Sequence, residues 1–143
     1  MRSCAKDDSR DFLKKGYTME DIRKQQIEAL ETIVEYVPKL AKAFETIAAE
    51  LKGEKAPDTD EFLKQAVDGL NFVIEMFNVT VALLNEKEEL FQKDVIEEKV
   101  KAFDQAYQDK DDAKIAEAIE DGIIPFIEIY AEISKVFLSK ENA

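Results

Sequence analysis

The chain has 143 residues, with 20 basic and 32 acidic side chains, no histidine, no tryptophan and one cysteine. This length argues for one domain with a proper core, and a hydrophobic content of 45% excludes disorder for most of the chain. Only four glycines and three prolines are present, which leaves little room for the tight turns of a sheet. We therefore predict an all-α protein, an antiparallel bundle of about five helices.

The composition also excludes most catalytic helical bundles. Without histidine, the usual nucleophile, zinc and di-iron sites cannot form. Cys4 has no second cysteine to pair with and no activating base, so we interpret it as a free thiol in a reducing compartment. The carboxylates between Asp109 and Glu120 resemble a calcium loop, but Lys114 stands where the sharp turn wants glycine. We therefore expect no enzyme activity, no cofactor and no metal.

The formal net charge of −12 limits the classes of partner. A negative field repels phosphate backbones and anionic lipid surfaces, so we expect no nucleic acid and no membrane as partner. A basic partner fits better, although acidic helix surfaces often serve only solubility. Residues 1–8 contain no apolar signal region, and residues 70–84 are too short and too polar to span a bilayer. We therefore expect a cytoplasmic protein.

Residues 1–17 are predicted to form a loosely ordered tail and residues 18–140 a single helical-bundle domain. Thr18 to Asp21 resembles a capping box, and Gly53 is a typical C-terminal stop. Pro38 lies inside the intervening apolar stripe without a slip in its phase, which predicts one long helix kinked at Pro38. The stripe recurs in steps of 3 and 4: Leu30, Ile33, Val37, Leu40, Phe44, Ile47 and Leu51.

A second helix is predicted near residues 59–85, with Asp58 and Glu61 at its start. It is the most apolar part of the chain. One apolar face consists of Leu63, Ala66, Leu70, Val73, Phe77, Val81 and Leu84, and a second of Phe72, Met76, Val79 and Leu83. A helix apolar on most of its circumference is packed on several sides, so we predict that this is the central helix. Alternatively, the second face is uncovered and awaits a partner.

Three further helices complete the predicted bundle. Residues 94–97 repeat the capping pattern for a third helix, which directs Ile96, Val100, Phe103 and Tyr107 inward. A turn at 109–112 precedes a short fourth helix, whose apolar residues are Ile115, Ala118 and Ile119 and which ends before Gly122. A fifth helix has Pro125 in its first turn and is predicted to direct inward Phe126, Ile129, Tyr130, Ile133, Val136 and Phe137.

Three segments, in order, resemble a group of small all-helical bacterial proteins of unknown function. They are Glu35-Tyr36-Val37-Pro38-Lys39-Leu40, then Gly69 to Glu75 with Asn78-Val79-Thr80, and Ala116 to Glu120 with Ile124-Pro125-Phe126-Ile127-Glu128. The resemblance extends from about Ile27 to Ile133. It implies a bacterial helical protein and supplies neither a mechanism nor functional residues.

Two functional hypotheses follow from the second helix. The leading one is a non-enzymatic, adaptor-like or chaperone-like interaction protein that presents an apolar face to a protein partner or to a second copy of itself. Its contacting residues would be Phe72, Met76, Val79 and Leu83. The alternative is a small-molecule binder with an apolar cavity inside the bundle. Its ligand would be oriented by Asn71, Glu75 or Tyr130, although Glu75 fits a solvent-facing strip better because a buried unpaired charge is costly.

Overall fold

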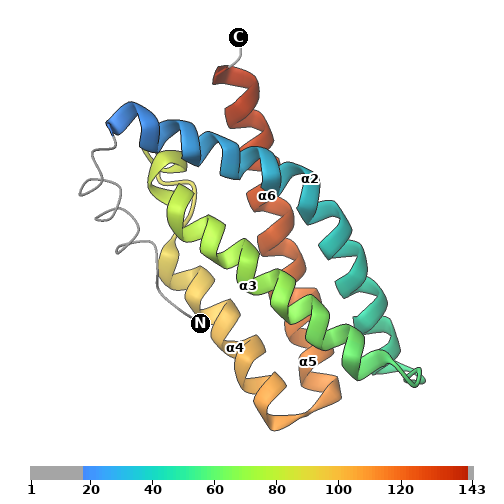
Figure 1. Ribbon diagram of the computed structural model, residues 1–143. Helices are drawn as coiled ribbons and strands as arrows, with labels where there is room; N and C mark the ends of the chain where they lie inside the picture. The colour runs from blue at the N-terminus through green and yellow to red at the C-terminus, as the bar shows by residue number, and fades with distance from the viewer. Residues whose placement is uncertain (1–17, 142–143) are drawn as a thin grey trace.

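The computed structural model describes residues 18–141, and every regular element among them is a helix. The elements are α2 (Met19–Lys52), α3 (Thr59–Leu84), α4 (Lys93–Asp109), α5 (Asp112–Ala118), the π-helix η1 (Ile119–Ile123) and α6 (Ile124–Glu141). Figure 1 shows consecutive helices running in opposite directions, with α5, η1 and α6 joined end to end. The predicted all-α class is confirmed. Because α5, η1 and α6 form one continuous helical segment, the described chain has four helical segments and not five separate helices. The predicted tail and Cys4 lie outside the described residues.

Both predicted ends of α2 are confirmed. The Asp21 N–H donates to Thr18 Oγ1 and the Thr18 N–H donates to Asp21 Oδ2, each at 3.1 Å. This capping box holds the pKa of Asp21 below its ordinary value, because the backbone N–H of Thr18 stabilises the ionised carboxylate. At the other end the Gly53 N–H donates to the Ala49 carbonyl at 3.0 Å. The helix continues through Pro38, which is exposed, and a kink at Pro38 stays a prediction.

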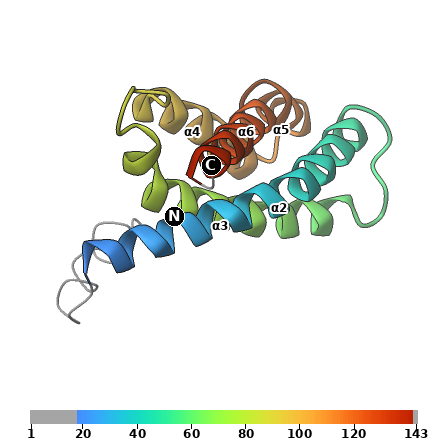
Figure 2. The same ribbon diagram turned by 90° about the horizontal axis from the view of Figure 1, so that it is seen from above.

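The helix that packs against the most neighbours is α2 and not α3. All members of the apolar stripe predicted for α2 are buried. This helix packs against α3, α5 and α6, whereas α3 packs mainly against α2 and more sparsely against α6. Figure 2 shows α2 and α3 on one side of the molecule and α4, α5 and α6 on the other. The prediction that residues 59–85 form the central helix is therefore wrong, because α3 lies beside α2 on one side of the molecule and packs extensively on α2 alone.

The apolar character of α3 is explained by the core that it helps to form. By length and composition alone α3 could cross a membrane, but 50% of its most apolar window is buried inside the bundle. Its first predicted face is buried throughout, from Leu63 to Leu84. At its start Asp58 makes no side-chain cap; Thr59 Oγ1 instead accepts from the Ala56 N–H at 2.8 Å and donates to Glu50 at 2.7 Å. A core helix of this kind needs no bilayer to account for its sequence.

The break predicted at Gly122 is absent because η1 accommodates Pro125. The Ile124 N–H donates to the carbonyl of Ile119, five residues back, as in a π-turn. Pro125 has no N–H to offer the Asp121 carbonyl, which instead accepts from Lys99 Nζ of α4 at 3.4 Å. Gly122 is buried against Lys99, so it serves helix packing and not helix termination.

The buried face of α6 differs from the predicted one. Phe126 and Tyr130 are buried as predicted and Ile133 and Phe137 are half-buried, but Ile129 is 52% exposed and Val136 is 46% exposed. The face that is buried is centred on Ile127, Tyr130 and Ser134. Ser134 can lie there because its hydroxyl donates to the Tyr130 carbonyl at 2.7 Å. The sequence prediction took the buried face of this helix from its apolar residues alone, so it could not identify a face that includes a buried serine.

Gly122→Ala is expected to raise the free energy of unfolding by about 0.5–1 kcal/mol, because glycine inside a helix is disfavoured by that amount. A Cβ at Gly122 would meet Lys99 Cβ at an ordinary contact distance of 3.4 Å. Urea unfolding measures the change, and Ala102→Gly at an exposed position of α4 calibrates the difference with the opposite sign. Destabilisation by Gly122→Ala would mean that the contact with Lys99 has no room for a methyl group.

Candidate functional site

A cluster of four aromatic rings occupies the core between α3, α6 and the loop before α4. Phe77 meets Phe91, Phe126 and Tyr130 edge to face, with ring centroids 5.1 to 5.2 Å apart. Tyr130 Oη and Thr80 Oγ1 lie 2.7 Å apart, and the Thr80 hydroxyl donates to the Met76 carbonyl at 2.8 Å. The phenol is therefore the donor to Thr80. Burial raises the pKa of Tyr130 well above its ordinary value.

The three residues predicted to orient a ligand do not meet at one site. Tyr130 is fully buried with its hydroxyl engaged by Thr80, so it is a core residue. Glu75 is exposed, as its position in a polar strip indicated, and Asn71 is half-buried. None of the three lines either of the surface hollows described below. The structure therefore does not bring them together around a cavity.

The face predicted to bind a partner is for the most part covered by α2. Leu83 is buried, and Met76 and Val79 are half-buried. Gln26 Nε2 of α2 donates to the Val79 carbonyl at 3.0 Å. Phe72 is 38% exposed and packs edge to face against Tyr36 of α2, with centroids 5.7 Å apart. Phe72 alone is exposed on this face, and the buried Leu83 also lines the groove at the end of the bundle that is described below.

Close packing of α2 on α3 depends on one small residue. A Cβ at Gly69 would overlap the Tyr36 hydroxyl and lie 3.0 Å from Leu40 Cδ1. Glycine lets the two backbones approach at this point, which brings Tyr36 within reach of Phe72. The second apolar face of α3 is thus part of an internal helix interface.

Asn85, at the end of α3, organises the loop to α4. Its Oδ1 accepts from the N–H groups of Leu90 and Phe91 at 2.9 and 3.0 Å, and its Nδ2 donates to the Phe91 carbonyl at 3.0 Å. This fold of the loop inserts Phe91 into the core and leaves Leu90 46% exposed at the surface. Sequence analysis gave this loop no functional role. The two adjacent apolar residues Leu90 and Phe91 in this otherwise polar loop were the sequence feature that could have indicated a packed or binding segment.

The exposed Leu90 forms one wall of a groove at the end of the bundle where the α6 C-terminus lies. We refer to it as the Leu90–Val136 groove, and its volume is about 510 Å³. Its apolar residues are Leu83, Leu84, Leu90, Ile133, Val136 and Phe137, and its rim consists of Arg23, Glu86, Lys87, Glu88, Glu132, Lys140 and Glu141. Six large apolar side chains are exposed among the described residues, and two of them, Leu90 and Val136, line this groove. It therefore gathers apolar surface that the fold itself leaves uncovered.

Arg23 ties the rim of this groove together from α2. Its Nη2 donates to Glu141 Oε1 of α6 at 2.7 Å, and its Nη1 lies 3.5 Å from Glu86 Oε2 of the loop. The guanidinium also lies over the Phe137 ring, 5.9 Å from its centroid. Because these side chains are 35 to 60% exposed, each ion pair contributes at most about 1 kcal/mol. They position the rim without closing the groove.

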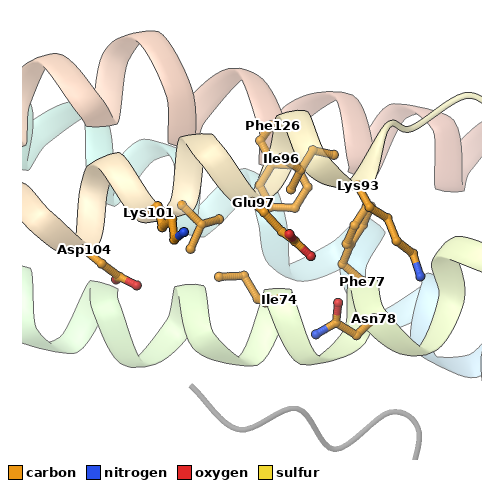
Figure 3. A pocket seen from close by; sticks show the side chains of 10 residues that line it. Ile74, Phe77, Asn78, Lys93, Ile96, Glu97, Lys101, Asp104 and Phe126 are labelled. Atoms are coloured by element: carbon orange, nitrogen blue, oxygen red, sulfur yellow. The ribbon is translucent and has the colours of Figure 1, made fainter.

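A second hollow lies between α3 and α4, and we refer to it as the α3–α4 groove (Figure 3). Its volume is about 340 Å³. Its floor consists of Ile74, Phe77, Val100 and Phe126, all buried, and only Ile96 among its apolar residues is half-buried. The rim comprises Asn78, Lys93, Glu97, Lys101 and Asp104. The groove has the size of a small-ligand site but exposes little apolar surface.

The ionisable side chains of both grooves lie on their rims. In the part of the chain that the structure describes, no three carboxylate or thiol side chains lie close enough together to hold a metal ion. The rims alternate acidic and basic groups, and the buried group with a raised pKa, Tyr130, lines neither groove. What the two grooves offer is apolar contact surface with charged borders.

Tyr130→Phe is expected to lower the free energy of unfolding by about 1 kcal/mol at pH 7, because the bond to Thr80 is lost. The folded phenol keeps its proton at pH values near 10, where the unfolded chain releases it, so the wild type loses stability there. The variant lacks this loss. Urea unfolding should therefore show the difference between the two proteins shrinking from about pH 9 to about pH 11. A difference that stays constant over this range would contradict the burial of an un-ionised phenol.

Comparison with known proteins places the chain in a family without a described activity. Residues 28–133 match the family described as a domain of unknown function (DUF8042). No curated protein and no solved structure matches the chain. The matched region includes the whole of α3, α4, α5 and η1, which agrees with the resemblance to small helical proteins of unknown function. The chain belongs to this DUF8042 family.

Proposed function

We propose that the protein is a non-enzymatic interaction module, adaptor-like or chaperone-like, that binds an amphipathic helix of a partner in the Leu90–Val136 groove. The observation that carries this proposal is the exposure of Leu90 and Val136, each 46%, in the lining of one groove. Apolar side chains gathered at one exposed site favour a binding surface over a solvated one. A groove lined in this way suits a helix that presents anchors at i and i+3 or i+4.

The charge of the protein supports a basic partner. The chain carries a net charge of −12, and four acidic side chains border the groove. The rim itself is nearly balanced, because Arg23 pairs with Glu86 and Glu141 and the other four charged side chains are two acidic and two basic. The preference for a basic partner therefore comes from the field of the whole chain. An acidic field accelerates the approach of a basic helix and discriminates against acidic ones. The single cysteine agrees with a cytoplasmic protein, and the resemblance to small bacterial helical proteins agrees with a bacterial one, so we include both in the proposal.

Val136→Asp is expected to reduce retention of the partner at least about tenfold, because it places an unpaired charge against a buried apolar anchor. The full chain, immobilised, is exposed to bacterial lysate at physiological salt, and retained proteins are quantified by mass spectrometry. Ile129→Asp is the matched control, since Ile129 is also an exposed β-branched residue of α6 but lies outside the groove. Circular dichroism confirms that both variants fold. Equal retention by Val136→Asp and the wild type would refute the proposed site.

A small-molecule binder is the second candidate, and the α3–α4 groove supports it. Its volume of about 340 Å³ and its aromatic floor of Phe77 and Phe126 are typical of a site for a small apolar ligand. Such a ligand would enter past the half-buried Ile96. This candidate stands second because the groove leaves little apolar surface uncovered.

Indole is a suitable probe of this second site. It is expected to raise the melting temperature of the wild type by about 2–4 °C for each kcal/mol of binding free energy. Ile96→Trp fills the mouth of the groove and should abolish the shift, whereas Val95→Trp, at an exposed position outside the groove, should not. No shift in the wild type at millimolar indole would count against a small-molecule site in this groove.

A further inference from the structure

The groove at the end of the bundle lies close to the point where α2 begins. Arg23, in the second turn of α2, lines the Leu90–Val136 groove and meets Glu141 of α6 at 2.7 Å. Thr18 caps α2 only five residues earlier, which is about 8 Å of helix. Any segment that precedes Thr18 therefore joins the bundle beside this groove.

The sequence before Thr18 has the chemistry that the groove requires of an occupant. Arg10-Asp11-Phe12-Leu13-Lys14-Lys15 combines an adjacent apolar pair with three basic side chains. Residues 1–17 carry five basic and three acidic side chains, whereas acidic groups predominate in the chain as a whole. The basic side chains of this segment thus complement the net negative charge of the chain, and its two apolar side chains match the apolar walls of the groove.

Distance permits contact between the two. Phe12 precedes Thr18 by six residues, which in extended form span at most about 20 Å. That length exceeds the distance along α2 from Thr18 to the groove wall at Arg23. A tether this short maintains an effective concentration on the order of millimolar, so even weak contacts would be populated.

We propose that residues 10–15 of the same chain occupy the Leu90–Val136 groove, with Phe12 and Leu13 against its apolar walls. This inference rests on the proposed function, because it gives the groove a built-in occupant that an external basic helix must displace. The segment would therefore lower the apparent affinity for the partner and act as an intramolecular competitor. A partner that outcompetes it would release residues 10–15 from the groove.

The absence of tryptophan from the sequence makes the docking directly measurable. Phe12→Trp in the full chain provides a single indole, whose emission is expected to be blue-shifted relative to the same chain in denaturant. Adding Val136→Asp should return the emission to the solvated value, whereas adding Ile129→Asp should leave it unchanged. The expected shift is independent of protein concentration, because the contact lies within one chain.

Three outcomes would overturn the proposal. If the folded Phe12→Trp protein with an intact groove emits at the solvated value, the segment is undocked. A blue shift that survives Val136→Asp would place the segment elsewhere. A shift that appears only at concentrations where size-exclusion chromatography detects a dimer would assign the segment to the groove of a second copy.

The competition has its own readout. The double substitution Phe12→Asp, Leu13→Asp is expected to increase partner retention several-fold over the wild type, with Val136→Asp abolishing the gain. Partner binding that depends on Val136, together with a solvated indole in the Phe12→Trp protein, would refute the intramolecular occupant and leave the proposed function intact. A docked indole in that protein without any Val136-dependent partner would refute the proposed function and leave the docking intact.

Discussion

The packing of Phe77 against three other rings joins parts of the chain that otherwise touch sparsely. α3 contacts α6 at few points, yet Phe126 and Tyr130 of α6 and Phe91 of the preceding loop all meet Phe77. Aromatic pairs of this geometry contribute about 0.5–1.5 kcal/mol each beyond burial of their area. The Thr80–Tyr130 hydrogen bond satisfies the one phenol in the cluster. Both grooves depend on this cluster, since Phe77 and Phe126 form the floor of one and Phe91 places Leu90 in the wall of the other.

The π-turn at η1 determines which side chains α6 exposes. A bond to the fifth preceding residue puts one more residue into the turn than an α-helical bond does, so the side chains that follow are rotated relative to α5. Pro125 makes this turn favourable because it offers no N–H to the Asp121 carbonyl, and Lys99 supplies the missing donor. The resulting phase buries Ser134 and turns Val136 outward. The wall of the Leu90–Val136 groove is thus a consequence of a proline at the start of the same helix.

The sequence predicted what local rules determine and missed what tertiary contacts determine. The capping box at Thr18, the Gly53 stop and the stripe of α2 depend on neighbouring residues and were predicted correctly. Periodicity reports which side chains avoid water but not which helix covers them, so α3 was wrongly placed at the centre. Continuity through Gly122 depends on Lys99 of another helix, and the role of Asn85 depends on how a loop folds back. The candidate site was missed for the same reason, because its two exposed apolar walls are far apart in the sequence and meet only in the fold.

Packing and charge contribute differently to the Leu90–Val136 groove. Its walls are held by buried neighbours such as Leu83 and Leu84, whereas its rim ion pairs are exposed and weak. The apolar walls of the groove therefore favour a partner that inserts an apolar side chain. The electrostatic field of the whole acidic chain favours a partner helix that is basic. A tethered occupant at an effective concentration on the order of millimolar sets a threshold for any partner. A partner present at micromolar concentration must bind the groove about a thousand times more tightly than residues 10–15 do, so the segment would exclude weak basic helices and admit only a matched one.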